Sequence, residues 1–234
     1  MLRYARIHLF YRLLAPYQVY ARTLRSKLFV ERMGLRPEMR VVDFGGTPAL
    51  WELVETPLDI TMINLEYETK FDPIKYKSHH KLTFAIGDVC NLEHDSNSFD
   101  LAFSNSVIEH VGDARRQQAF ADNIRRLAPR YWVQTPAKWF PIEAHTGMPF
   151  WWFYPDRLRA KLIASWRDKL PAWAEMVEGT RLVERSQLTS LFPDGRLLTE
   201  RSLGITKSYI AYRSVSIYMT YMPIPLAQAV ACLA

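Results

Sequence analysis

Polar and small residues that could bind a ligand recur at the ends of short apolar segments in the first half of the chain. The candidates are Asp43, Gly45, Gly46, Asn64, Glu66, Asp88, Val89, Ser104 and Asn105. A nucleotide-like ligand needs small residues where it crosses the backbone, an acceptor for ribose hydroxyls and a partner for the adenine amine. Each residue alone is explained equally well by a turn or a helix cap. The row as a whole indicates a ligand site.

Two histidines could remove a proton from a bound molecule. His110 follows the fourth apolar segment beside Glu109, and His145 stands two residues after Glu143. Histidine titrates near neutral pH and is therefore a common general base. Either histidine could instead be a packing residue, so both interpretations stay open. The candidate catalytic residues are His145, His110 and Glu143.

The segments that position these residues alternate between strand and helix. Strands are predicted over 40–44, 60–64, 82–86, 99–104, 131–134, 195–201 and 207–213. Thr47 is expected to cap a short helix that Pro48 begins, and a longer helix is expected to start at Gly112-Asp113. Such alternation requires crossovers, so we predict an α/β fold with a Rossmann-like, seven-stranded, mostly parallel sheet, helices on both faces and an antiparallel last strand. In these sheets ligands bind beyond the carboxyl ends of the strands.

Four stretches of the sequence combine strand ends with polar or glycine-containing turns: VVDFGGTP, IGDVCNLEHDSNSFDLAFSNSVIEHV, RRLAPRYWVQTP and ERSLGITKSYIAYR. Together they resemble one family, the type 11 methyltransferase domains of the class I S-adenosylmethionine-dependent enzymes. The second stretch is the most specific, because a glycine loop alone occurs in many proteins. The chain departs from the family in that loop, where Thr47 and Pro48 follow Gly46 and glycines would usually alternate.

The resemblance implies S-adenosyl-L-methionine as cofactor and assigns a place to each candidate. Asp43, Gly45 and Gly46 would line its methionine portion. Asn64 or Glu66 would hold the ribose, and the chain leaves open which of the two does so. The last assignments are Asp88 with the Val89 backbone at the adenine, and Ser104 with Asn105 near the sulfonium.

We divide the chain into four parts on these patterns. Residues 1–37 form an N-terminal helical lid, 38–136 the cofactor-binding core, 137–180 a substrate-covering insertion, and 181–234 the closing strands and tail. The insertion holds five of the seven tryptophans, and it follows the fifth strand, so it should overhang the ligand edge. Its aromatic residues could pack as a second small core or wall an acceptor site.

The net charge of +6 comes from the N-terminal arm. Residues 1–40 hold nine Lys and Arg against two acidic residues, and the remainder is close to neutral, so no nucleic-acid partner is expected. Two helices are predicted there, broken at Pro16. The second carries an apolar stripe of Tyr17, Tyr20, Ala21, Leu24 and Leu28 and ends at Gly34. The arm could be a lid or make a weak membrane-surface contact.

Other features bear on location. Cys90 and Cys232 form no disulfide framework and no zinc spacing, which favours the cytoplasm and predicts no metal site. The last 21 residues carry no charged side chain. Two prolines argue against a spanning helix there, and the tail could pack on the domain or on a membrane.

These observations predict an S-adenosylmethionine-dependent methyltransferase that modifies a hydroxyl or amine of a small-molecule acceptor, such as a natural product, a sugar or a lipid-linked glycan. A homodimer is compatible with the sequence. One alternative is a non-catalytic partner subunit of the same fold, and another is a peripheral membrane enzyme with a lipid-linked acceptor. A nicotinamide dehydrogenase is disfavoured because G-x-G-x-x-G is absent.

Overall fold

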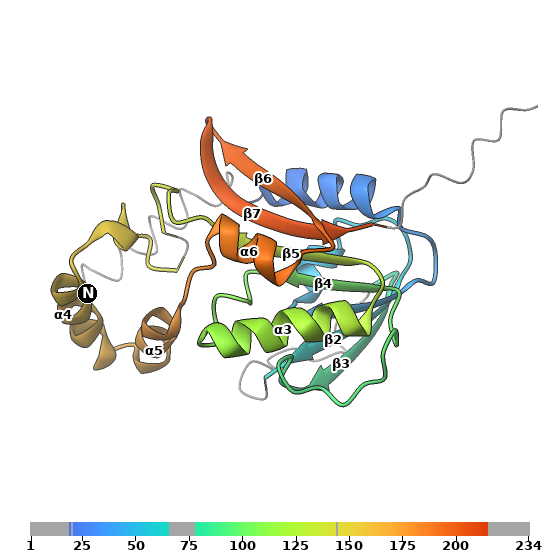
Figure 1. The fold of residues 1–234 in the computed structure, drawn as a ribbon, viewed down its shortest axis with the longest axis horizontal. Helices are drawn as coiled ribbons and strands as arrows, with labels where there is room; N and C mark the ends of the chain where they lie inside the picture. The colour runs from blue at the N-terminus through green and yellow to red at the C-terminus, as the bar shows by residue number, and fades with distance from the viewer. Residues whose placement is uncertain (1–18, 20, 66–77, 144, 215–234) are drawn as a thin grey trace, which may run out of the picture.

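The fold is a seven-stranded sheet of the predicted kind (Figure 1). A computed structural model describes residues 19, 21–65, 78–143 and 145–214. The strands, in spatial order, are β3 (Lys81–Ile86), β2 (Asp59–Asn64), β1 (Arg40–Phe44), β4 (Leu101–Asn105), β5 (Tyr131–Pro136), β7 (Ile205–Arg213) and β6 (Arg196–Ser202). β1 to β5 pair in parallel, and β7 is antiparallel to both of its neighbours. The predicted fold class is confirmed, and the predicted strand bounds shift by no more than two residues.

The central strands are short apolar runs because both of their faces are covered. Four consecutive residues of β1 and four of β4 are buried, as expected for parallel strands between two helical layers. On one side lies α3 (Ala114–Leu127), which buries Phe120, Ile124 and Leu127 as predicted. The helix begins where Asp113 Oδ1 accepts a hydrogen bond from the backbone N–H of Arg116 at 3.0 Å. The core therefore lies in two clusters, one on each face of the sheet.

The other face is covered by a helix over residues 21–33, which ends before Gly34 as predicted. Its predicted apolar stripe is wrong at Leu24, whose exposed fraction is 49%. Phe29 and Met33 are buried instead, because the helix turns these residues toward the sheet. Phe29 makes edge-on contacts with three aromatic rings at centroid distances of 5.0 to 5.9 Å. This part of the N-terminal arm therefore belongs to the core.

We expect Phe29→Ala to lower the free energy of unfolding by about 3 to 5 kcal/mol, because it leaves a cavity among aromatic side chains. Leu24→Ala, on the same helix, should change it by less than about 0.5 kcal/mol because Leu24 is exposed. Urea denaturation of the two variants measures both values. Equal losses would contradict the placement of this helix.

The insertion forms a small core of its own beside the sheet. It contains η2 (Trp151–Phe153), α4 (Asp156–Arg167) and α5 (Pro171–Gly179), which Figure 1 shows standing at one end of the sheet. The Trp166 ring lies 5.5 Å from that of Trp151 and 4.8 Å from that of Trp173. Most of the aromatic residues therefore pack on one another, although Trp139 is 58% exposed. The chain then returns through α6 (Arg185–Leu191), which packs against α3.

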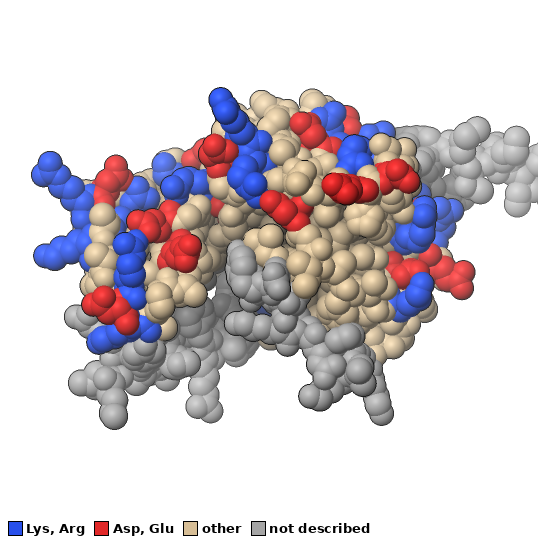
Figure 2. Space-filling model, turned by 90° about the horizontal axis from the view of Figure 1, so that it is seen from below, with Lys and Arg blue, Asp and Glu red and all other residues tan. Residues whose placement is uncertain are grey.

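The capping role predicted for Thr47 is wrong. The Thr47 side chain makes no capping hydrogen bond, although Pro48 does begin the four-residue helix α2 (Pro48–Trp51). Glu66, the helix predicted before Pro16 and the uncharged tail beyond residue 214 lie outside the described residues. Within the described ranges no helix is long and apolar enough to cross a membrane. Figure 2 shows Lys and Arg interspersed with Asp and Glu across the face in view.

Candidate active site

Asp43 lies at the carboxyl end of β1 and is completely buried. Trp51, which α2 places below it, donates a hydrogen bond from Nε1 to Asp43 Oδ2 at 2.7 Å. Oδ1 has no hydrogen-bond partner among the described residues. Burial raises the pKa of Asp43 to about 7, and the Trp51 hydrogen bond only partly opposes this shift. The site thus holds a carboxyl oxygen with unused hydrogen-bonding capacity.

The loop after β1 passes so close to Asp43 that only glycine fits. A Cβ on Gly46 would stand 1.7 Å from Asp43 Oδ2, and a Cβ on Gly45 would stand 2.5 Å from a methyl group of Val107. Gly45 also has a φ of +66°, which disfavours any other residue. Asn64, at the end of β2, donates from Nδ2 to the carbonyl oxygen of Gly46 at 3.1 Å. The glycine pair is therefore a close-approach cradle supported from the neighbouring strand.

Ser104 completes the polar row at this edge. Ser104 of β4 pairs with Phe44 of β1, so it lies one position further along the strands than Asp43. The side chain is fully buried, and its Oγ has no hydrogen-bond partner among the described residues. Two buried polar atoms without partners at the same edge of the sheet, one of them beside a glycine cradle, fit a ligand that carries both donors and acceptors, such as S-adenosylmethionine.

Asp88 follows β3 and is held by two groups. Its Oδ2 lies 2.7 Å from Arg116 Nη2, and its Oδ1 accepts from the backbone N–H of Cys90 at 2.9 Å. Burial would raise the pKa of Asp88, but the Arg116 and Cys90 hydrogen bonds keep it below its usual range. The carboxylate therefore stays ionised, and its remaining lone pairs can accept from an adenine amine.

The end of β4 is tied to the N-terminal helix. Arg25 donates from Nη1 to Asn105 Oδ1 at 2.8 Å and forms an ion pair with Glu200 of β6 at 2.9 Å. The two charged side chains are only 14% and 16% exposed. Arg25 was counted only as part of the basic arm in the sequence. In the folded chain Arg25 orients the Asn105 side chain.

Glu143 organises the loop that carries His145. One carboxylate oxygen accepts from the backbone N–H groups of His145 and Thr146 at 2.9 and 2.6 Å. The other lies 2.6 Å from His145 Nδ1. Trp173 of α5 donates from Nε1 to the carbonyl oxygen of His145 at 3.1 Å, which ties this loop to the insertion core. The carboxylate therefore fixes both the backbone and the ring of His145.

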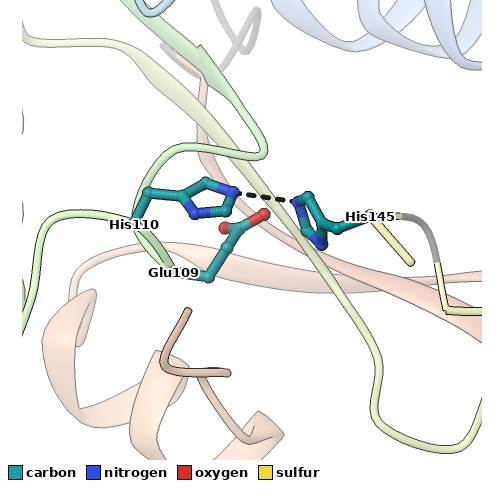
Figure 3. A group of neighbouring side chains, drawn as sticks. All are labelled: Glu109, His110 and His145. Carbon is teal, nitrogen blue, oxygen red and sulfur yellow. Dashed lines mark hydrogen bonds between the residues drawn. The ribbon is translucent and has the colours of Figure 1, made fainter. Parts of the chain in front are cut away.

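The loop brings His145 to His110, which follows β4. Their Nε2 atoms lie 2.9 Å apart, and Glu109 sits beside both rings (Figure 3). Glu109 is completely buried, with Oε2 accepting from Thr135 Oγ1 at 3.0 Å. We call Glu109, His110, Glu143 and His145 the histidine cluster.

Burial and neighbouring charges separate the pKa values within this cluster. Burial, followed by the charge of His145, lowers the pKa of His110 to about 4. Burial raises the pKa of Glu109 to about 7. Burial would lower the pKa of His145, but the hydrogen bond and charge of Glu143 raise it above its ordinary value. His145 is therefore the member of the pair that more readily carries a proton.

The structure thus gathers the predicted residues into two groups. Asp43, the glycine pair and Asn64 meet at the ends of β1 and β2, with Ser104 at the end of the neighbouring β4, and the three predicted catalytic residues meet in the histidine cluster. Their catalytic and binding roles stay predictions. Four contributing residues were not proposed from sequence: Arg25, Trp51, Glu109 and Arg116. Of these, only Glu109 had a local signal, its place in the SNSVIEHV stretch.

Residues 46–130 match the family model described as a methyltransferase domain. Over this range the chain is similar to that domain family. The matched range begins in the glycine loop and includes Asp88, Ser104 and His110. This match agrees with the sequence resemblance to S-adenosylmethionine-dependent methyltransferases. A search of curated proteins found no significant match.

Solved structures share the fold of this chain. Phosphoethanolamine N-methyltransferase 2 of Haemonchus contortus, solved with S-adenosyl-L-methionine, is 13% identical with a TM-score of 0.55, over 81% of this chain and 52% of its own. The PH0226 protein of Pyrococcus horikoshii OT3 is 15% identical with a TM-score of 0.53, over 84% and 89%. The CurJ carbon methyltransferase is 12% identical with a TM-score of 0.53, over 84% and 54%. The chain thus spans about half the length of the nematode enzyme.

The buried carboxyl of Asp43 gives a pH-dependent stability that can be measured without cofactor. The pKa of Asp43 is about 7 in the folded protein and 3.8 in its ordinary exposed state, so the folded protein binds more protons than the unfolded chain between these values. Stability contributed by this group therefore falls as pH rises toward 7. Asp43→Asn keeps an acceptor for Trp51 and cannot ionise.

We expect the stability of Asp43→Asn relative to wild type to increase by about 2 kcal/mol between pH 5.5 and pH 8.5. In melting temperature this is roughly 4 to 8 °C. Thermal unfolding of both proteins at the two pH values gives the difference. Melting temperatures that move in parallel would show that Asp43 does not titrate in this range.

Proposed function

We propose that this protein transfers the methyl group of S-adenosylmethionine to a hydroxyl or amine of a small-molecule acceptor. The observation that carries the proposal is the polar edge of the sheet. Asp43 Oδ1, beside the glycine cradle, and Ser104 Oγ, at the end of the neighbouring strand, are both buried without a partner among the described residues. Native proteins rarely leave such atoms unpaired unless a ligand uses them.

Each binding group supplies a different contact in this proposal. The raised pKa of Asp43 favours a cationic partner such as the amino group of a methionine moiety. Asn64, or Glu66 beyond it, holds the ribose, and Asp88 with the Val89 backbone receives the adenine. Asn105, oriented by Arg25, lies at the end of β4 near the reacting sulfonium.

The reaction needs alignment more than covalent help from the protein. The bound cofactor supplies an already activated methyl group on a positive sulfonium. Holding acceptor and donor in line therefore accounts for much of the acceleration. A hydroxyl acceptor must also lose its proton, and we place that step at the histidine cluster, where Glu143 orients His145 and stabilises its positive charge.

The position of the insertion is consistent with a small acceptor in the proposed site. Its loop carries His145 onto the end of β4, and its helices α4 and α5 form the adjoining core. This arrangement covers the site with chain from one side and helps to exclude water. The exposed rings of Trp139 and Phe153, with centroids 5.1 Å apart, offer an apolar surface to the less polar part of an acceptor.

The proposal is tested with S-adenosylmethionine that carries a deuterated methyl group. The purified protein is incubated with a panel of hydroxyl and amine compounds, and mass spectrometry detects the labelled methyl on the product. We expect label in at least one acceptor and an equal amount of S-adenosylhomocysteine. Cofactor binding with no transfer to any acceptor would favour the non-catalytic partner subunit.

A further inference from the structure

The hydrogen-bond partners of the two histidines determine which ring nitrogens carry protons. Nδ1 of His145 lies 2.6 Å from a Glu143 oxygen, which in the ionised form can only accept, so Nδ1 is the protonated nitrogen. Thr180 donates its hydroxyl hydrogen to the carbonyl oxygen of Met176 at 2.8 Å. Its oxygen lies 3.4 Å from His110 Nδ1 and accepts there. Both neutral rings therefore have their lone pair on Nε2.

These two lone pairs point at each other. The Nε2 atoms lie 2.9 Å apart (Figure 3). Two nitrogen lone pairs at this distance repel unless a proton or a cation lies between them. The arrangement therefore calls for a positive charge at that point.

Glu109 adds a third ligand atom to the same space. One of its carboxylate oxygens is buried without a hydrogen-bond partner among the described residues, and the other accepts from Thr135. The ligand atoms of Glu109, His110 and His145 all lie within 4.8 Å of one another. Burying an unpaired carboxylate oxygen is costly, and a cation offsets that cost.

We propose that Glu109, His110 and His145 bind a divalent transition-metal ion of the zinc class. Two imidazoles and one carboxylate are ligands that Zn²⁺ prefers, whereas Mg²⁺ prefers oxygen ligands alone. With Zn–N bonds of about 2.0 to 2.1 Å, a tetrahedral ion holds two nitrogens about 3.3 Å apart. The rings would need to separate by only about 0.4 Å. Three protein ligands leave one position open to another molecule.

Glu143 and Thr180 act as positioning residues for this site. Each contacts the Nδ1 atom of one histidine and so directs its Nε2 lone pair at the ion. As an account of how an acceptor hydroxyl is activated, the inference rests on the proposed function. An ion at this site would lower the pKa of a hydroxyl bound at its open coordination position. As a metal site, it is tested without any turnover.

The test titrates the purified full-length protein, stripped with a chelator, with Co²⁺ and then with Zn²⁺. We expect one Co²⁺ per chain with visible d–d absorption, and its displacement by Zn²⁺. Glu109→Gln keeps the acceptor for Thr135 and should weaken binding of both ions about 100-fold, and Glu143→Gln should weaken it roughly 10- to 100-fold. His94→Ala, an exposed histidine, is the matched control and should bind as wild type does.

Three outcomes would overturn the metal site. They are no Co²⁺ absorption in the wild type, binding that Glu109→Gln and His145→Ala leave unchanged, or equal loss in His94→Ala. Circular dichroism of each variant shows whether it is folded. S-adenosylhomocysteine binding, measured in the presence of chelator, tests the proposed function separately, so either idea can fail alone.

Discussion

Asp88→Ala is expected to remove most of the thermal stabilisation that S-adenosylhomocysteine gives the wild-type protein. A ligand that binds only the folded state at 100 times its Kd stabilises it by about 2.7 kcal/mol. In a chain of this size that corresponds to roughly 5 to 10 °C in melting temperature. Asp88 is kept ionised by Arg116 and Cys90, so its loss takes away a charged acceptor for the adenine amine.

Differential scanning fluorimetry with increasing S-adenosylhomocysteine measures this shift. Asp122→Ala is the matched control, because Asp122 also pairs with an arginine but lies on the exposed side of α3. The control should show the full shift, and Asp43→Ala should show little of it. A full shift in Asp88→Ala would mean that the cofactor lies elsewhere or uses other groups.

His145→Ala is expected to lower turnover of a hydroxyl acceptor by roughly a hundredfold or more while cofactor binding stays intact. The ring sits between Glu143 and His110, so the substitution removes the centre of the histidine cluster. The expectation holds whether His145 takes the proton itself or holds an ion that activates the acceptor. The two cases differ in chelator sensitivity, which only the second predicts.

The measurement is the initial rate of labelled methyl transfer across pH 6 to 9, with His94→Ala as control. Glu143→Gln should lower turnover less than His145→Ala does, because glutamine can still accept from Nδ1 but does not stabilise a charged ring. Equal rates for His145→Ala and wild type at every pH would remove the histidine cluster from the reaction. The acceptor would then be one that needs no deprotonation.

The sheet could be predicted from sequence because its signals are local. Each strand is a short apolar run, and each is followed by polar or small residues that end it. β1 was located with its bounds correct, and Asp43, Ser104 and Asp88 were placed at strand ends for the same reason. The rotation of the helix over residues 21–33 was wrong at Leu24. The spacing of its apolar residues is compatible with more than one buried face of the helix. The packing of Phe29 among the aromatic rings beneath the helix selects the observed face.

The contacts that make the site specific depend on tertiary packing. His110 and His145 were each named, but they are separated by 35 positions and meet only because the insertion folds back. Arg25 and Glu200 are 175 positions apart, and no sequence motif joins them. The sequence predicted Asn105 as a ligand-binding residue, but its hydrogen bond with Arg25 is evident only in the folded structure. The sequence predicted no metal site, and the three ligands that we propose have no regular spacing.

The central claim is that the polar edge of the sheet binds S-adenosylmethionine. Isothermal titration of the full-length protein with S-adenosylhomocysteine tests it most directly, with Gly46→Ala as the matched variant. We predict one site per chain in the wild type and no measurable binding in Gly46→Ala, because the added Cβ would displace Asp43. The absence of any heat of binding in the wild type at millimolar ligand would contradict the claim. Binding that Gly46→Ala leaves unchanged would also contradict it.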